Sequence, residues 1–327
     1  MHRRFHTIEH RYLAFIEQVL RRSVRARQPN SVYEPARYLL DAGGKRMRPM
    51  LVMLSCAAAG GDVRKSVYAA AALEILHTFT LVHDDIMDNA LSRRGRATVH
   101  TRWNTNVAIL VGDEFLALAY RSLFRTEHKN IKRIAELFTE GVVEVCEGQG
   151  YDKEYESRND VSFDEYRMMI TKKTARLLAV GCEIGGILGG ANERRCRALR
   201  KFGEHIGRAF QIQDDLLDII SDEKTFGKII GGDLREGKKT FLLLTALECT
   251  TGQDHALISR VVNEKGVPEI LVPAIKEIYE RCGVIEKTRS AIEKECTLGI
   301  RYLKTLPAIA EREMLRRYAL QLAGRTF

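Results

Sequence analysis

Hydrophobic residues recur at helical spacing through nearly all of this 327-residue chain. Leu73, Leu76 and Phe79, for example, are three residues apart and share one side of a predicted helix. Predicted breaks fall at glycine-containing points such as Gly60–Asp62. Strand-like alternation between hairpin turns is absent. The pattern predicts one all-α domain over residues 1–327, a single large helical bundle of ten or more helices.

The composition is that of a folded, water-soluble protein. Hydrophobic residues make up 45% of the chain and charged residues 29%, so it can bury a core and solvate a surface. No run reaches the roughly 20 apolar residues of a membrane span, since Glu183 interrupts the longest candidate. The seven cysteines are widely spaced without a Cys-x-x-Cys pair, which favours reduced thiols. We therefore expect a cytoplasmic protein without a membrane span.

The chain is basic, with 52 Lys and Arg against 43 Asp and Glu, a formal net charge of +9. Such an excess indicates either a solvated basic surface or an anionic partner, such as nucleic acid, acidic lipid or a phosphorylated small molecule. A nucleic-acid-binding face would interleave basic and aromatic residues, whereas the aromatic residues here lie at internal positions of the pattern. We therefore expect no nucleic-acid partner.

Three carboxylates crowd one predicted helical turn in the run HDDIMD from His83 to Asp88. Asp84 and Asp88 are four residues apart and therefore stack on one helix face, with Asp85 beside them. Such carboxylates repel one another unless a cation lies between them. Taken alone, the run is compatible with an acidic surface patch or with a metal site.

The same spacing returns 130 residues further along, in the run QIQDDLLD from Gln211 to Asp218. Gln211, Asp214 and Asp218 follow the i, i+3, i+7 rule and share one helix face. Apolar residues surround both acid runs. We therefore expect the two Asp-rich helices to line a central cavity between them.

Oxygen ligands without a neighbouring cysteine favour Mg²⁺, a hard cation that keeps water ligands and bridges carboxylates to phosphate. Two acid clusters indicate more than one Mg²⁺ ion and a substrate that brings its own phosphates. The competing metal site, a di-iron bundle, needs Glu-x-x-His motifs on two helices, and the sequence does not have two.

Basic residues gather in four further stretches: GGKRMRP at 43–49, RRG at 93–95, KKT at 172–174, and a glycine-broken loop at 227–240. In the first stretch two glycines precede three cations, so backbone and side chains could close on a phosphate. Each stretch alone is also compatible with a solvated basic loop. Together they predict two anion sites, one bridged by metal and one held by cations. None matches a nucleotide-binding glycine motif.

These motifs resemble those of the trans-isoprenyl diphosphate synthases, the polyprenyl synthetase family, and are most similar to geranylgeranyl and farnesyl diphosphate synthases. Five motifs occur in the family's order over a core of about residues 34–247: GGKRMRP, HTFTLVHDDIMD with RRG, KTA, FQIQDDLLD, and GK with DLREGKKT. The resemblance implies a homodimeric, Mg²⁺-dependent prenyltransferase. It would condense isopentenyl diphosphate head-to-tail with dimethylallyl, geranyl or farnesyl diphosphate.

The resemblance also implies roles for individual residues. The metal ligands would be Asp84, Asp88, Asp214 and Asp218, with Asp85 and Asp215 supporting them. The allylic diphosphate would lie at Arg93, Lys173, Thr174, Gln211, Lys228 and Lys238, and Lys173, Thr174 and Gln211 would also be catalytic. Isopentenyl diphosphate would bind Lys45, Arg48, His77 and Arg94.

Product length is expected to depend on Phe79, Leu76 and Leu73, which form a stripe that leads away from Asp84. An aromatic residue five positions before the acid run resembles synthases of short and medium chains. Thr80, instead of a second aromatic residue, leaves more room than in farnesyl-type enzymes. This favours geranylgeranyl diphosphate as product, with farnesyl or farnesylgeranyl diphosphate as alternatives. The same three residues are also compatible with ordinary core packing.

Two functions of other classes share part of this pattern. A terpene cyclase would have the first acid run but would not need GGKRMRP or the second acid run. A non-catalytic subunit of a heteromeric synthase would be expected to lose one acid run, and both are intact here.

Overall fold

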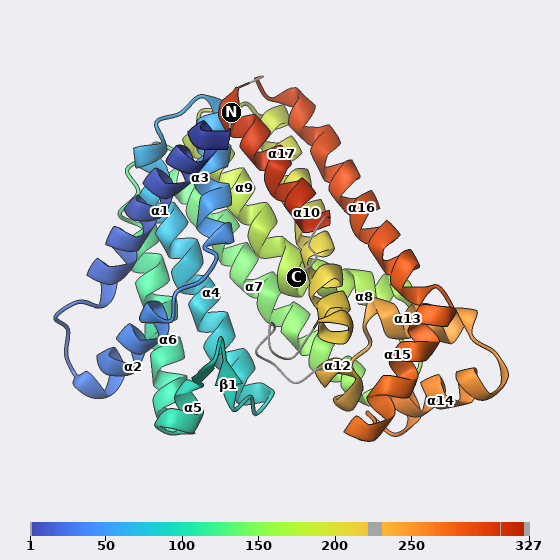
Figure 1. Cartoon of the computed structure of the whole chain (residues 1–327). Coiled ribbons are helices and arrows are strands. Elements are labelled where there is room, and N and C mark those ends of the chain that lie inside the picture. Colours follow the sequence, from blue (N-terminus) through green and yellow to red (C-terminus); the bar gives the residue numbers. More distant parts are fainter. Residues whose placement is uncertain (1, 222–230, 308, 324–327) are drawn as a thin grey trace. The chain divides into compact units, whose positions relative to one another are not determined.

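The computed structural model describes residues 2–221, 231–307 and 309–323 of the chain. These residues form helices and one short hairpin (Figure 1), which confirms the predicted all-α class. They divide into two compact units, each assembled from segments that are distant in sequence. Unit 1 comprises the described residues of 1–138, 180–199 and 305–315, and unit 2 comprises those of 139–179, 200–304 and 316–327.

Unit 1 consists mainly of the N-terminal helices. Its elements are α1 (His2–Val24), α2 (Asn30–Asp41), α3 (Met47–Ala59), a 3₁₀ turn (Val63–Ser66), α4 (Val67–Met87), β1 (Ser92–Arg93), β2 (Arg96–Ala97), α5 (Val99–Arg102) and α6 (Thr105–Leu123). The predicted periodicity recurs in α1, where Tyr12, Ile16 and Leu20 are buried at intervals of four residues.

Helix α4 is the centre of unit 1 and packs against α1, α3 and α6. After Val67 and Tyr68 it has four consecutive alanines, the residue with the highest helix propensity, and their small side chains let the neighbouring helices approach closely. On α6, Gly112 faces the His83 ring of α4, and a Cβ atom at that position would collide with the ring. The two helices therefore pack side by side up to the end of α4 that carries the first acid run.

Unit 2 is also helical. Its elements are α8 (Phe163–Ile170), a π-helical turn (Thr171–Ala175), α12 (Gly232–Arg235), α13 (Phe241–Cys249), α14 (Gly252–Asn263), a 3₁₀ turn (Glu269–Leu271), α15 (Val272–Arg281) and α16 (Val284–Tyr302). Four further helices have residues in both units: α7 (Ile131–Ser157), α9 (Arg176–Leu188), α10 (Glu193–Ile220) and α17 (Ala310–Ala323), as does the 3₁₀ turn Leu303–Thr305.

Two local structures differ from the predicted run of α-helices. The segment with Lys173 is a π-helical turn instead of regular α-helix, and it lies against α10, where a Cβ atom at Gly207 would collide with the backbone of Ala175. Residues 92–97 form a β-hairpin, although the sequence shows no strand-like alternation. Its strands are two residues long, too short to produce a period-two pattern.

Candidate active site

The first acid cluster lies where α4 ends. The N–H of Asp88, the residue after the last helical position, donates to the carbonyl oxygen of Asp84 at 2.9 Å. Both residues are partly exposed, whereas Asp85 is 4% exposed and accepts a hydrogen bond from Arg93 Nε at 2.6 Å. Burial raises the pKa of Asp85, and the Arg93 guanidinium opposes that rise. Asp84 and Asp88 thus lie one helical turn apart, and Asp85 is engaged with a cation.

The β-hairpin holds two of the predicted cations beside α4. Arg94 and Gly95, the two loop residues, have φ of 53° and 70°. Positive φ at both positions is the backbone of a type I′ turn, in which glycine is favoured. The Arg94 guanidinium donates to the carbonyl oxygen of Gly43, so the hairpin contacts the glycine pair of the first basic stretch.

A second group of predicted residues surrounds His77 in unit 1. Arg48 Nη1 lies 3.0 Å from His77 Nε2. Loss of hydration, followed by the positive charges of Arg48, Arg94 and Arg93, lowers the pKa of His77 well below its usual range. His77 is therefore neutral at neutral pH, and the cations around it form a positive environment suited to an anion.

The remaining basic residues of the first stretch have separate surroundings. Lys45 is exposed. Arg46 is buried and binds Glu17 and Glu74, each at 2.8 Å, as well as the carbonyl oxygen of Leu40 at 3.1 Å. Arg46 thus joins α1, α2 and α4 and is a structural residue.

The second acid cluster lies on α10 in unit 2. Asp215 is buried, and both its carboxylate oxygens accept hydrogen bonds: from Tyr166 Oη at 2.8 Å and from Gln211 Nε2 at 2.9 Å. Burial, together with the charges of Asp233 and Asp214, raises the pKa of Asp215. Because its oxygens are engaged with side chains, this carboxylate is poorly placed to bind a metal directly.

Asp218, at the end of this cluster, is hydrogen-bonded to the start of α12. Its Oδ2 accepts the N–H of Asp233 at 3.1 Å, and its carbonyl oxygen accepts the N–H of Gly231 at 2.9 Å. Asp233 is an acidic residue to which the sequence analysis assigned no role. Asp233 is the first residue of DLREGKKT, which follows the acid run FQIQDDLLD in the family's order of motifs. This position in a shared motif could have indicated that Asp233 lies near the second acid cluster.

The π-helical turn carries Lys173 and Thr174 to the same part of unit 2. Lys173 Nζ lies 2.6 Å from Asp152 Oδ2 of α7, and Thr174 Oγ1 donates to Gln211 Oε1 at 2.6 Å. Thr174, Gln211 and Asp215 therefore form one chain of hydrogen bonds. Single π-helical turns occur frequently at functional sites. Asp152 is a further residue that the sequence analysis did not single out.

The basic loop before α13 is only partly described. Lys238 Nζ lies 2.6 Å from Glu236 and 3.8 Å from Asp233, which places it beside the second acid cluster. Lys239 is buried and donates to the carbonyl oxygens of Gly237 and Glu156. Lys228, predicted to bind the allylic diphosphate, lies outside the described residues.

The proposed chain-length residues are buried on α4. Phe79 is 9% exposed, and Leu76 and Leu73 are each 1% exposed. The Phe79 ring lies 4.7 Å from the His83 ring, and Leu73 packs against Gly181 of α9. Burial is expected both of a cavity wall and of ordinary core, so a role in chain length stays a prediction.

The donor chemistry of both acid clusters fits Mg²⁺. Aspartate oxygens predominate, and the Cys residues of the chain are not part of either run. Among the described residues, no three His, Cys, Asp or Glu side chains form a ready-made metal cage. Mg²⁺ is usually bound by one or two carboxylates together with water and substrate phosphate. A metal cluster shared by Asp84 and Asp214 stays a prediction.

Comparison with known proteins identifies the family. Residues 29–278 match the polyprenyl synthetase family. A short chain isoprenyl diphosphate synthase from Methanothermobacter thermautotrophicus is 37% identical over 306 residues, covering 93% of this chain and 94% of the relative. The chain therefore belongs to the polyprenyl synthetase family and is a prenyltransferase, a trans-prenyl diphosphate synthase.

Solved structures agree with this assignment. The geranylgeranyl pyrophosphate synthetase of Pyrococcus horikoshii superposes with a TM-score of 0.90 at 34% identity, covering 98% of each chain. A polyprenyl synthase from Caulobacter crescentus, solved with calcium and isoprenyl diphosphate, superposes with a TM-score of 0.91 at 28% identity, covering 98% of this chain and 97% of its own. Among the described helices, none is long and apolar enough to cross a membrane.

Proposed function

We propose that the protein makes geranylgeranyl diphosphate by Mg²⁺-dependent head-to-tail condensation of isopentenyl diphosphate with allylic diphosphates. The proposal depends on one observation in unit 1: Arg93 engages Asp85 of the acid cluster at the end of α4, whereas Arg48 lies against the neutral His77. The acid cluster suits a diphosphate that arrives with metal, and the cations suit a diphosphate held without metal.

Four carboxylates would form the metal site for the allylic diphosphate. Asp84 of α4 and Asp88, which directly follows that helix, would hold Mg²⁺ on the allylic diphosphate together with Asp214 and Asp218 of α10. When bound, Mg²⁺ supplies positive charge that stabilises the leaving diphosphate. Arg93, Lys173, Lys228 and Lys238 would bind the same diphosphate. Asp85 and Asp152, which engage Arg93 and Lys173, would hold these two cations in place.

Isopentenyl diphosphate would bind Lys45, Arg48, His77 and Arg94. A neutral His77 suits this site: Nε2 accepts from Arg48, and Nδ1, which lies 3.5 Å from Thr80 Oγ1, then carries the N–H that would donate to phosphate. The three cations provide the charge, so no metal is required here.

In the reaction, the bond between allylic C1 and oxygen breaks and the electron pair leaves with the diphosphate. The double bond of isopentenyl diphosphate then attacks C1, forming the new carbon–carbon bond. Loss of a proton from the adjacent carbon restores a double bond, and the released diphosphate accepts that proton. Thr174 and Gln211 would lie beside the reacting carbons, and Phe79, Leu76 and Leu73 would limit the growing chain. Exclusion of water protects the allylic cation from hydrolysis.

Incubation of the purified protein with labelled isopentenyl diphosphate and each allylic primer, followed by product sizing, tests the proposal. We expect C20 geranylgeranyl diphosphate as the main product, and the names of the relatives support this size class. C15 or C25 as the end product would indicate farnesyl or farnesylgeranyl diphosphate synthesis instead. Hydrocarbons formed from an allylic diphosphate alone would indicate a terpene cyclase. No turnover with any primer would contradict the proposal or indicate a non-catalytic subunit.

We also propose that the active form is a cytoplasmic homodimer in which residues 1–327 act as one domain. Light scattering of the purified protein measures the mass directly, and a monomer of 37.1 kDa with full turnover would contradict the dimer.

A further inference from the structure

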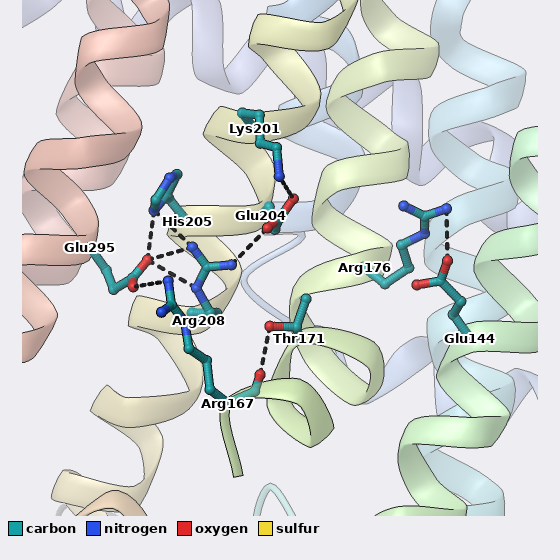
Figure 2. Close-up of polar contacts among 9 residues, drawn as sticks. All are labelled: Glu144, Arg167, Thr171, Arg176, Lys201, Glu204, His205, Arg208 and Glu295. Atoms are coloured by element: carbon teal, nitrogen blue, oxygen red, sulfur yellow. Dashed lines mark hydrogen bonds and ion pairs between the residues drawn. The ribbon is translucent and has the colours of Figure 1, made fainter. Parts of the chain in front are cut away.

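Unit 2 contains a cluster of charged side chains that the proposed reaction does not use. Figure 2 shows its centre, Glu295 of α16, facing His205 and Arg208 of α10 and Arg167 of α8. Glu295 Oε2 lies 2.7 Å from His205 Nδ1, 3.0 Å from Arg208 Nε and 2.9 Å from Arg208 Nη2. Glu295 Oε1 lies 3.7 Å from Arg167 Nη2. One carboxylate therefore joins three basic side chains from two other helices.

Three of the four side chains are largely removed from water, whereas the Arg167 side chain is 59% exposed. Arg208 is 4% exposed and His205 is 9% exposed, and the Glu295 side chain is 13% exposed. Burial alone would raise the pKa of Glu295, but hydrogen bonds from His205 and Arg208 outweigh it and lower that pKa. Replacing a buried ion pair such as Glu295–Arg208 by apolar residues is often neutral or stabilising. A contribution to folding stability is therefore a weak explanation for this ion pair. Buried charges do, however, restrict how helices can pack, because each charge must meet its partner.

Both ends of the cluster lead to residues of the proposed allylic site. The carbonyl oxygen of Arg167 accepts a hydrogen bond from Thr171 Oγ1 at 2.6 Å, and Thr171 begins the π-helical turn that contains Thr174. Arg208 lies three residues before Gln211 on α10. Thr174 and Gln211 then meet at 2.6 Å. Glu295 thus contacts both segments just before the point where they come together.

We infer that Glu295 is a positioning residue that fixes the π-helical turn and α10 relative to each other, so that Thr174 and Gln211 are aligned for the allylic substrate. This inference depends on the proposed function, since it assigns Thr174 and Gln211 to that substrate. Small displacements of reacting groups by distant residues cost up to about 100-fold in rate.

Glu204 offers a matched control on the same arginine. It accepts Arg208 Nη1 at 2.8 Å and Lys201 Nζ at 2.9 Å. All three residues lie on α10, so Glu204→Gln removes a negative charge from Arg208 without loosening a contact to α16 or α8. Glu295→Gln removes the same charge and also weakens the link between helices.

The test compares wild type, Glu295→Gln, Glu204→Gln and the double variant Glu295→Gln/Arg208→Met by thermal unfolding and steady-state kinetics. For Glu295→Gln we expect kcat/KM for the allylic diphosphate to fall about 10–100-fold, with the KM for isopentenyl diphosphate within about twofold of wild type. Glu204→Gln should retain wild-type kinetics. The double variant also removes Arg208, the buried cation that Glu295→Gln leaves with Glu204 as its carboxylate partner, so its Tm should recover in part while kcat/KM for the allylic substrate stays low.

Three outcomes would overturn the inference while leaving the proposed function intact: unchanged allylic kinetics in Glu295→Gln, an equal loss in Glu204→Gln, or full kinetic recovery in the double variant. The last outcome would mean that Glu295 only neutralises Arg208. If Glu295→Gln fails to fold, kcat/KM for the allylic diphosphate in the double variant and in Glu204→Gln tests the inference. An inactive wild-type protein would contradict the proposed function, and this inference with it.

Discussion

Arg46 and Arg48 are two residues apart in one basic stretch, and the fold gives them different tasks. Arg46 is buried between Glu17 and Glu74 and joins three helices. Arg48 lies against His77, and Lys45 is exposed. A count of charges in GGKRMRP therefore overstates the cations available to a substrate. Arg46 is not available to a substrate, because it is buried and two carboxylates already neutralise its charge.

Arg48→Ala should mainly weaken binding of isopentenyl diphosphate. Loss of one charge-assisted contact costs about 1.5–3 kcal/mol, or roughly 10–150-fold in affinity. Binding of the allylic substrate with Mg²⁺ should change much less. Calorimetric titration of each substrate measures both effects, and Arg64→Ala, which removes an exposed cation paired with Asp62, is the control. A larger loss for the allylic substrate would show that the two diphosphate sites are assigned the wrong way round.

His77 should make the stability of the protein depend on pH. Its pKa in the folded state is well below the value of about 6.5 expected in the unfolded chain. As pH falls below 6.5 the unfolded state binds a proton that the folded state does not, so the free energy of unfolding falls by at most about 1.4 kcal/mol per pH unit. The effect is absent above pH 6.5 and levels off once the folded-state pKa is passed.

The measurement is chemical denaturation of wild type and His77→Gln between pH 5 and 8. The stability difference between the two should shrink or reverse as pH falls below 6.5, because only the wild type carries the titrating group. A difference that stays constant across this range would mean that folding does not lower the pKa of His77.

At the scale of elements, the sequence predicts a helix well where apolar residues recur at helical spacing because one face of that helix is buried. Leu73, Leu76 and Phe79 are buried on α4 as their spacing indicates, and both acid runs fall on helices or at a helix end. The π-helical turn at 171–175 and the hairpin at 92–97 could not be predicted. They depend on close packing at Gly207 and on positive φ at Arg94, neither of which leaves a periodic pattern. Partners distant in sequence, such as Asp152 and Glu295, were likewise invisible to local patterns.

Helix α4 also offers a test of product length. Phe79 lies about 7.5 Å along the helix axis from Asp84, and Leu76 about 12 Å, at 1.5 Å per residue. Phe79→Ala removes a buried ring and leaves an apolar void that a longer prenyl chain can fill. We expect products at least one C5 unit longer, with initiation intact because no proposed diphosphate or metal residue is changed.

Chromatographic sizing of the products decides this prediction. Phe138→Ala is the matched control, since it removes a fully buried ring of unit 1 that packs against Tyr120 instead of lying on α4. Both variants should lose stability by about 3–5 kcal/mol. Only Phe79→Ala should change product length. An unchanged length in a folded Phe79→Ala protein would leave Phe79 as ordinary core.

At the scale of the whole molecule, the residues proposed for the reaction are divided between the two units. Asp84, Asp88 and the cations around His77 belong to unit 1, whereas Asp214, Asp218, Thr174 and Gln211 belong to unit 2. Neither unit carries the full set of residues that the proposed reaction needs. Activity is therefore the measurement that tells whether the two acid clusters act on one substrate.

A double-mutant cycle on Asp84 and Asp214 provides that measurement. If both hold Mg²⁺ on the same allylic diphosphate, Asp84→Ala and Asp214→Ala should each lower turnover by several orders of magnitude. The double variant should then lose little more than either single variant, because residues that act as a unit are not additive. Chelation of Mg²⁺ should abolish wild-type turnover to the same level. Asp160→Ala, an exposed acid of unit 2 paired with Arg158, should leave turnover unchanged. Losses that multiply in the double variant would mean two independent sites, and near-normal turnover of either single variant at saturating Mg²⁺ would remove that aspartate from the metal site.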